Sequence, residues 1–222
     1  KSFNRWSKIK SFSKEIFSNF DLCLSQNNKS IDRLKKLGAK NIKKVGNLKF
    51  SALEVESKSK LTNDQIKFFK KKKILFCAVS THDPEELFCK NLHSSICSIY
   101  KNSISIIIPR HVERSNEIIN IFEKSGFITH IHSSKKKINK KTQIYIVDTF
   151  GETKSFLKLS KITFMGKSIH GYGGQNPIEA AQLGNRIIHG PNIENFVEVY
   201  NFLKKLGIST KIKSYKDLEK LI

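Results

Sequence analysis

The residues with the clearest chemical potential lie in a glycine-rich stretch, residues 171–181, that leads into a predicted helix. Its glycines tolerate positive φ and let a ligand approach the backbone. Pro177 suits a first helical turn, where its missing N–H costs no hydrogen bond. The free N–H groups and the dipole of such a helix start favour a phosphate. Glu179 is then placed to accept hydrogen bonds from the ribose of a nucleotide, unless the glycines merely start a helix.

Polar clusters also follow other strand-like runs of the chain. They are Ser80-Thr81-His82, Pro109-Arg110-His111, Asp148-Thr149-Phe150-Gly151-Glu152, and Gly166-Lys167-Ser168 ahead of the glycine-rich stretch. Ligands of open parallel sheets bind at the carboxyl ends of the strands. We therefore expect one crevice to collect all these clusters, since polar residues without a shared role would fall at both ends of the sheet.

Arg110 is a candidate ligand-binding residue among them, because a guanidinium fork at the sheet rim suits a phosphate or a base edge. The alternative is a salt bridge to Glu113 or Glu117 on the following helix. His82 and His111 receive no role, because histidines at strand ends are often structural hydrogen-bond partners.

Gly151 and Glu152 stand where a strand ends and a helix begins, so free backbone N–H groups are expected there as well. Asp148 is interpreted as the N-cap of that helix. Glu85 and Glu86 fall in a first helical turn, where carboxylates complement the helix dipole whatever the function.

Other kinds of chemistry find little support in the sequence. We find no G-x-S-x-G elbow and no Walker sequence, so nucleophilic catalysis and ATP hydrolysis are poorly supported. No metal-ligand triad is visible either, and we expect no metal and no cofactor. The four cysteines lack C-x-x-C spacing and are interpreted as free thiols of a reducing compartment.

Apolar runs of strand length alternate with amphipathic stretches, which predicts an α/β fold with a Rossmann-like parallel sheet and helices on both faces. The predicted strands are residues 21–25, 42–46, 74–79, 103–108, 127–131, 143–147, 162–165 and 186–189. The predicted helices are residues 30–37, 84–100, 112–124, 152–159, 176–183 and 193–206. Glycines at 38, 126, 184 and 207 follow helices as C-terminal caps do.

Strand content divides the chain unevenly. Residues 1–47 hold too few strands for a domain and are expected to be the tail of a preceding one, 48–63 a linker, and 64–222 a complete nucleotide-binding domain. The chain begins at Lys1, and its one methionine is Met165, so we expect a fragment of a longer protein.

The charge balance predicts an anionic partner. Lysine and arginine number 41 against 19 acidic residues, a formal charge of +22. A nucleic acid, an anionic lipid surface and a phosphorylated substrate all fit such a charge, and so does a lysine-rich proteome bias. No apolar run approaches the ~20 residues of a membrane-spanning helix.

Taken in order, the motifs resemble those of the Kdo transferases, which add 3-deoxy-manno-octulosonic acid (Kdo) from CMP-Kdo to the lipid A precursor. The matching positions are Ser2-Phe3-Asn4-Arg5-Trp6, Gln26, Leu37-Gly38-Ala39, Gly46-Asn47-Leu48-Lys49-Phe50, Ser80-Thr81-His82, Glu85-Glu86, Pro109-Arg110-His111, Glu113-Arg114, Asp148-Thr149, Gly151-Glu152, Gly173-Gly174, Asn176-Pro177, Glu179 and Gly190-Pro191. The resemblance runs through nearly the whole chain.

The resemblance implies the C-terminal half of a B-type, two-domain glycosyltransferase. It implies CMP contacts at the sites matching Pro109, Arg110, Phe150, Gly151, Glu152, Asn176, Pro177, Ile178 and Glu179. Lys49 matches a transition-state stabiliser, while the general base belongs to an N-terminal domain and has no counterpart here. The chain departs from the family at Lys167, usually glycine, and at Gln175, usually histidine.

The implied activity is an inverting, metal-independent transfer of Kdo from CMP-Kdo to lipid IVA in lipopolysaccharide synthesis, for which this chain alone would be inactive. The implied partners are CMP-Kdo, the anionic lipid A precursor and the inner-membrane surface at its cytoplasmic face, with no nucleic acid. Two alternatives stay open. One is a UDP-sugar transferase or epimerase of the same fold, and the other is a basic nucleic-acid-binding module.

Overall fold

The computed structural model describes residues 2–46, 61–134, 136–214 and 217. The chain forms two compact units, Lys1–Glu56 and Ser57–Ile222, and each is described by itself. Most of the expected linker and the predicted transition-state stabiliser Lys49 lie outside the described residues.

The first unit is small and built around two parallel strands. Its elements are α1 Ser2–Trp6, α2 Lys10–Ser18, β1 Cys23–Ser25, α3 Asn28–Leu37 and β2 Ile42–Lys44. Helix α3 begins where the Asn27 side chain accepts a hydrogen bond from the Ser30 N–H, and it ends at Gly38 in the left-handed conformation. The predicted strands at 21–25 and 42–46 and the predicted helix at 30–37 are thus present, with shifted ends.

Large apolar side chains of the first unit remain exposed. Ile9, Phe12, Phe20, Leu22 and Leu24 each have between 47% and 55% of their surface accessible. Stable domains of this size bury such residues. The described part of the unit therefore leaves several large apolar side chains accessible to solvent.

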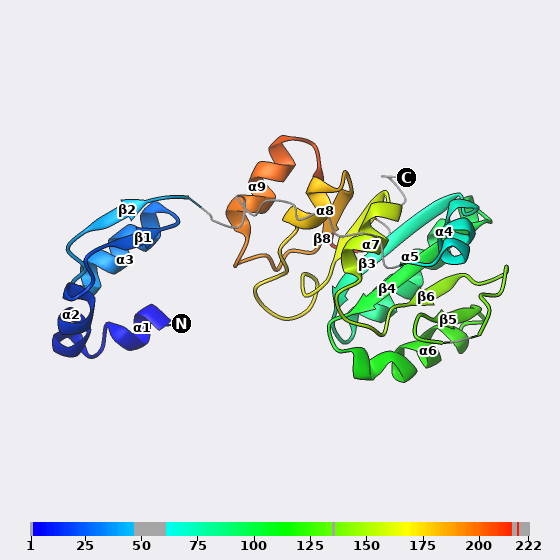
Figure 1. Cartoon of the computed structure of the whole chain (residues 1–222), viewed down its shortest axis with the longest axis horizontal. Helices are drawn as coiled ribbons and strands as arrows, with labels where there is room; N and C mark the ends of the chain where they lie inside the picture. Colours follow the sequence, from blue (N-terminus) through cyan, green and yellow to red (C-terminus); the bar gives the residue numbers. More distant parts are fainter. Residues whose placement is uncertain (1, 47–60, 135, 215–216, 218–222) are drawn as a thin grey trace. The chain divides into compact units, whose positions relative to one another are not determined.

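The second unit contains a seven-stranded parallel sheet (Figure 1). Its elements are α4 Asn63–Lys70, β3 Ile74–Thr81, α5 Glu85–Ile99, β4 Ser103–Pro109, the 3-10 turn η2 Val112–Arg114, α6 Ser115–Glu123, β5 Thr129–Ile131, β6 Ile144–Ile146, α7 Thr153–Leu159, β7 Ile162–Met165, α8 Ile178–Gln182, β8 Arg186–His189, α9 Val197–Lys205 and β9 Ser209–Lys211. The strand order is β5-β6-β4-β3-β7-β8-β9.

Alternating side chains of the strands form a core on each face of the sheet. On one face Cys77 and Val79 of β3 pack with Phe69 of α4 and Phe156 of α7. On the opposite face Phe76 and Ala78 pack with residues of α5 and α6, including Leu92, Ile96, Ile118 and Phe122. Helices thus cover both faces, as predicted.

The chain reverses its direction of strand addition between β3 and β7. Strand β4 lies on one side of β3, followed outward by β6 and then β5. The next strand in the chain, β7, lies on the other side of β3. Ligand crevices of open α/β sheets form beyond the carboxyl ends of strands at such a switch point. The loops that follow β3 and β7, residues 80–84 and 166–177, therefore occupy the position where a ligand is expected.

Two elements of the second unit were not predicted from the sequence. Strand β9 has the sequence Ser-Thr-Lys, which lacks the apolar pattern of a strand and pairs only because β8 offers its edge. Helix α4 begins inside the stretch interpreted as a linker, where Thr62 and Gln65 form a capping box. That capping pair was a signal available in the sequence.

Candidate functional site

The loops that carry the predicted site residues lie along one edge of the sheet, because β6, β4, β3, β7 and β8 are parallel neighbours. Backbone hydrogen bonds join them. The Arg110 N–H donates to the Thr81 carbonyl at 3.0 Å, and the Asn192 N–H donates to the Ser168 carbonyl at 2.8 Å. The polar clusters therefore converge at the carboxyl ends of the strands, as expected.

Arg110 presents its guanidinium to solvent at this edge. It is exposed, while Pro109 before it is buried as the last residue of β4. The alternative partners are otherwise engaged, since Glu113 lies 3.3 Å from His111 and Glu117 lies 2.9 Å from Arg114. Within the described residues Arg110 makes no ion pair, so its charge is available to a ligand.

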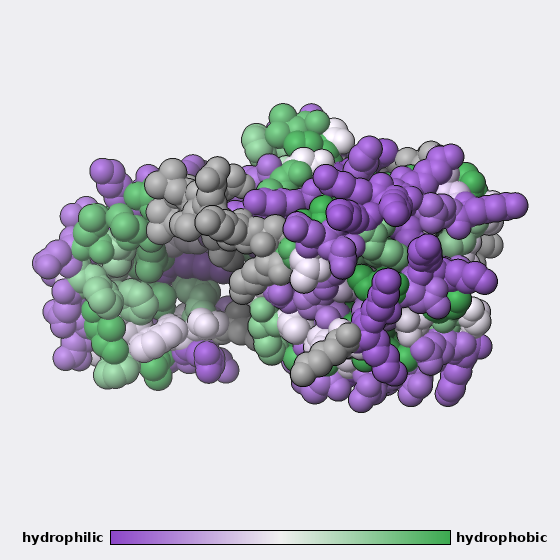
Figure 2. All heavy atoms as spheres, turned by 45° about the vertical axis from the view of Figure 1, so that its right-hand side comes forward, coloured by the Kyte–Doolittle hydropathy of each residue, from purple (hydrophilic) through white to green (hydrophobic). Residues whose placement is uncertain are grey.

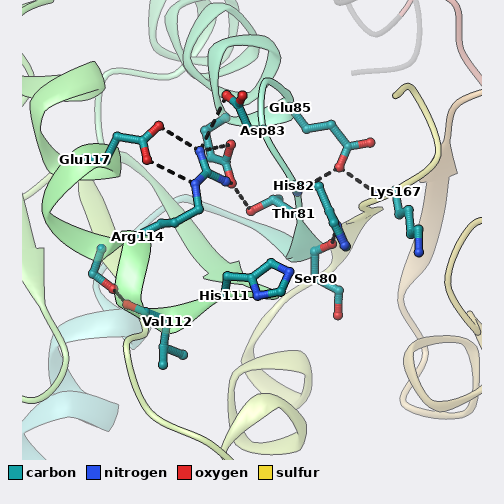
Figure 3. A network of polar contacts seen from close by, with 12 residues as sticks. Ser80, Thr81, His82, Asp83, Glu85, His111, Val112, Arg114, Glu117 and Lys167 are labelled. Carbon is teal, nitrogen blue, oxygen red and sulfur yellow. Dashed lines mark hydrogen bonds and ion pairs between the residues drawn. The ribbon is translucent and has the colours of Figure 1, made fainter. Parts of the chain in front are cut away.

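Arg114, four residues on, has a structural role. Its guanidinium donates to both carboxylate oxygens of buried Glu86 at 3.2 and 3.4 Å and also contacts Glu117 and Asp83 (Figure 3). The hydrogen bonds that Arg114 donates to Glu117 raise the pKa of Arg114, and burial opposes that rise. Thr81 donates to Glu86 at 2.8 Å. Glu86 therefore fastens helix α5 to the end of β3 and to the turn η2, which leads into α6.

Glu85 also has a structural role, which its interpretation as a carboxylate of a first helical turn did not predict. Its fully buried carboxylate accepts hydrogen bonds from the backbone N–H groups of Lys167, Ser168 and Ile169 at 2.6, 2.9 and 3.0 Å. It also accepts from the His82 N–H at 3.1 Å. Consecutive N–H groups in a loop form an anion-binding nest. Here the protein's own carboxylate fills that nest, so an external anion must find other donors.

Lys167, which stands where the resembled family usually has glycine, has an unusual backbone conformation. Lys167 has φ 56°, the left-handed region in which glycine is normally found. Its neighbour Gly166 packs directly on the preceding loop, because a Cβ there would lie 2.2 Å from the Ser80 carbonyl oxygen. The family's usual glycine at position 167 is thus explained, and the lysine adopts the same conformation with its N–H bound to Glu85.

The histidines of this edge behave as structural partners. His82 Nδ1 lies 2.9 Å from the Ser80 carbonyl, and its ring packs edge to face on His111. Burial lowers the pKa of His82. Neither histidine receives a catalytic role from this geometry.

The loop after β6 corrects one prediction. Asp148 is not the N-cap of α7; that position is Glu152, which makes no side-chain cap bond. The Asp148 carboxylate instead accepts hydrogen bonds from the N–H and hydroxyl of Ser133 at 2.9 and 2.5 Å. Glu152 lies 2.8 Å from His132 Nε2 and accepts from the Thr149 hydroxyl. Between them Phe150 is 72% exposed.

Gly151 completes this loop, with φ 77° and an exposed backbone. Only glycine adopts that conformation without strain. The exposed Phe150 and Gly151 therefore form the part of the loop that a ligand can reach.

The glycine-rich stretch has the expected conformation. Gly171, Gly173 and Gly174 all have positive φ. The Gly173 N–H donates to the Glu194 carboxylate at 2.8 Å, so this donor is also engaged internally. The Gln175 carbonyl accepts from the Tyr200 hydroxyl at 3.1 Å, a contact that depends on the backbone and tolerates the glutamine found there.

The helix that follows is shorter than predicted. Pro177 is its N-cap, and α8 covers only Ile178–Gln182. The Asn176 side chain accepts a hydrogen bond from the Ile178 N–H at 3.2 Å. Ile178 itself packs in a small core with Val199 and Leu203. A ligand can therefore reach the Asn176 amide and the exposed Glu179 carboxylate, but not the Ile178 side chain.

The described residues were also searched for metal-binding groups and for membrane-spanning helices. No group of three or more histidine, cysteine or acidic side chains there is arranged to hold a metal ion. In the same residues no helix is long and apolar enough to cross a membrane.

A hollow of about 890 Å³ lies apart from the predicted site and contains none of its residues. Six lysines and one carboxylate line it: Lys67, Lys71, Lys72, Lys136, Lys137, Lys140 and Asp64. This hollow is thus strongly basic.

Comparisons with known proteins agree with this architecture. Residues 1–52 match the family model described as 3-deoxy-D-manno-octulosonic-acid transferase (kdotransferase). Proteins named 3-deoxy-D-manno-octulosonic acid transferase are 27% identical in Haemophilus influenzae and 30% identical in Rickettsia felis, over 98% of this chain in each case. The chain spans about half the length of these relatives, 51% and 47% respectively.

A solved structure resembles this chain over most of its length. It is the crystal structure of the C-terminal CMP-Kdo binding domain of WaaA from Acinetobacter baumannii, with 25% sequence identity and a TM-score of 0.65. The match covers 71% of this chain and 82% of that one. The parallel sheet with helices around it is therefore that of the C-terminal half of a B-type glycosyltransferase, as predicted.

Proposed function

We propose that this chain belongs to the Kdo transferase family, binds CMP-Kdo through its second unit and serves in the transfer of Kdo during lipopolysaccharide synthesis. The observation that carries the proposal is that three features lie at one edge of the sheet. They are Arg110, which makes no ion pair within the described residues, the exposed loop at Phe150 and Gly151, and Asn176 with Glu179. That sheet resembles a domain whose title names CMP-Kdo as its ligand.

In the proposed mechanism the Kdo group moves by an inverting displacement at its anomeric carbon, with CMP as the leaving group. Negative charge then develops on the departing phosphate. A guanidinium and an amide placed in advance stabilise such charge in the transition state. We assign this role to Arg110 and Asn176, together with Lys49, and we assign the ribose hydroxyls to Glu179. Cationic and hydrogen-bond donors suffice for this chemistry, so the proposal includes no metal and no cofactor.

We propose further that the chain is one part of a longer enzyme. The exposed apolar side chains of the first unit support this, because a larger domain would bury them. The curated relatives, about twice as long, support it too. The general base would then reside in the remainder, and the 222-residue chain alone is expected to bind the donor without turning it over. Transfer of Kdo to a lipid acceptor by the isolated chain would contradict this.

The acceptor in this proposal is lipid IVA, a bis-phosphorylated lipid, at the cytoplasmic face of the inner membrane. The formal charge of +22 and the lysine-lined hollow support an anionic surface as partner. Figure 2 shows hydrophilic residues over most of the visible face of the second unit. Sedimentation with vesicles containing anionic lipid tests this part. The double variant Lys67→Glu with Lys71→Glu should bind the vesicles less than Lys204→Glu with Lys205→Glu, and equal binding would count against the hollow.

A thermal-shift titration tests the donor assignment. CMP is expected to raise the melting temperature of the chain, since a ligand that binds only the folded state stabilises it. UDP should have little effect. Stabilisation by UDP and not by CMP would favour a UDP-sugar transferase or epimerase of the same fold. Salt-sensitive binding to DNA or RNA that survives Arg110→Ala and Glu179→Ala would favour a nucleic-acid-binding module.

A further inference from the structure

Two consecutive residues that follow β5 hold both ends of the loop predicted to bind the nucleotide. Ser133 donates its N–H and its hydroxyl to the two carboxylate oxygens of Asp148, at 2.9 and 2.5 Å. His132 Nε2 lies 2.8 Å from a carboxylate oxygen of Glu152. Loop 148–152 is thus fastened at its first and last residues to one neighbouring segment.

The hydrogen bonds around His132 follow one direction. The Thr62 N–H donates to Gln65 Oε1 at 2.8 Å, which orients the amide so that its Nε2 donates to the Tyr145 hydroxyl at 3.1 Å. The Tyr145 hydroxyl proton is then directed at His132 Nδ1, 2.8 Å away. With Nδ1 accepting, the proton of a neutral imidazole resides on Nε2 and is donated to Glu152.

This chain of hydrogen bonds is shielded from water. The side chains of His132 and Glu152 are 9% and 14% exposed, and Tyr145 is fully buried. The His132 ring packs edge to face on Phe156. Burial raises the pKa of Tyr145, so its phenol stays a neutral donor. Hydrogen bonds in such surroundings are stronger than in water and fix one geometry.

The middle of the loop has the opposite character. Phe150 is 72% exposed and Gly151 is exposed at φ 77°. A short loop fixed at both ends loses its conformational freedom when the protein folds. The loop then loses less conformational entropy when the ligand binds, which increases the affinity.

We propose that His132 and Ser133 are positioning residues for the nucleotide. They do not contact the ligand themselves. Through their bonds to Glu152 and Asp148 they hold Phe150 and Gly151 in the conformation that binds it. The inference rests on the proposed function, since it assigns nucleotide binding to this loop. Neither position takes part in the motifs that carry the family resemblance.

The test is the dissociation constant of CMP, measured by calorimetry on the 222-residue chain and its variants. His132→Leu keeps roughly the bulk of the ring and removes both hydrogen bonds of the imidazole. We expect CMP affinity to fall about tenfold, which corresponds to the free energy of about one hydrogen bond. His132→Gln can still donate to Glu152 from its amide and should stay within about threefold of the parent chain. Equal affinity for His132→Leu and the parent overturns the inference.

Matched variants separate positioning from general destabilisation. Ser133→Ala removes the hydroxyl bond at an exposed site and should weaken CMP about threefold, whereas Ser134→Ala, one residue on, should leave it unchanged. This pair decides the inference if His132→Leu does not fold, and equal affinities for the two variants overturn it. A parent chain without measurable CMP affinity would overturn the proposed function and this inference together.

Discussion

The Glu85 carboxylate accepts a hydrogen bond from the backbone N–H of Ser168, 83 residues further along the chain, at 2.9 Å. Glu85 opens the helix after β3, and Ser168 lies in the loop after β7. The bond therefore closes the switch point of the sheet. It also shows that the first N–H groups of the loop serve the fold, and leaves the recognition of a phosphate to residues further along.

Replacing Glu85 with glutamine should destabilise the protein strongly. An amide offers one acceptor oxygen and brings an N–H donor against backbone donors, so buried N–H groups of residues 167–169 lose their partner. We expect a loss of about 3 kcal/mol in the free energy of unfolding, measured with urea. Glu198→Gln, at an exposed first-turn position of α9, is the control and should change stability little. Equal stabilities of the two variants would contradict the account.

Replacing Arg114 with methionine should leave the fully buried Glu86 carboxylate without its cation. Removing one partner of a buried pair costs about 3 kcal/mol. The double variant Glu86→Gln with Arg114→Met should recover part of that loss, because a neutral amide replaces the unpaired charge. A double-mutant cycle in urea measures the coupling between them. Strictly additive losses would show that the pair is not coupled.

Gly166→Ala should disrupt the contact between the loops after β3 and β7. Its Cβ would lie 2.2 Å from the Ser80 carbonyl oxygen, which is backbone and cannot rotate away. We expect a loss of about 3 kcal/mol, at the upper end for overpacking. Gly184→Ala is the control, because a Cβ there meets nothing within 4 Å and only the positive φ of 79° opposes it, at about 1 kcal/mol. A Gly166 variant as stable as the Gly184 variant would contradict this close approach.

The protein should lose stability as the pH falls from about 6.5 to 4, in part through His93. Burial lowers the pKa of His93 to about 4, and its ring bonds to Ser105 and Cys97. The unfolded chain binds the proton first, near pH 6.5, so folding is penalised progressively until the folded pKa is reached. The contribution is about 3 kcal/mol, from the difference between the two pKa values.

The matched comparison for this pH dependence is His93→Gln, whose amide can bond to the same partners. Burial also lowers the pKa of His82, His130 and His189, and these groups contribute equally in both proteins. Urea unfolding at pH 7 and pH 4.5 should therefore show a smaller loss for His93→Gln than for the parent chain. Identical losses would mean that His93 does not titrate as described.

The sequence alone predicted the alternation of strands and helices and the edge of the sheet along which Arg110 and Glu179 both lie, because both follow from local periodicity and from the parallel sheet. It did not predict the roles of Glu85 and Asp148. Their partners, at 167–169 and at Ser133, lie far away in the chain, and no local pattern records such contacts. Strand β9 was missed for a similar reason, since its pairing partner and not its composition makes it a strand.

The measurement that tests the central claim most directly is calorimetric binding of CMP to the chain and to two pairs of variants. We predict that CMP binds, and that Arg110→Ala and Glu179→Ala each weaken it about tenfold or more, as expected for lost hydrogen bonds to charged groups. The controls Lys161→Ala, before β7 at the other end of the sheet, and Glu198→Ala should bind like the parent. Absence of CMP binding, or full affinity in both the Arg110 and the Glu179 variants, would contradict the account.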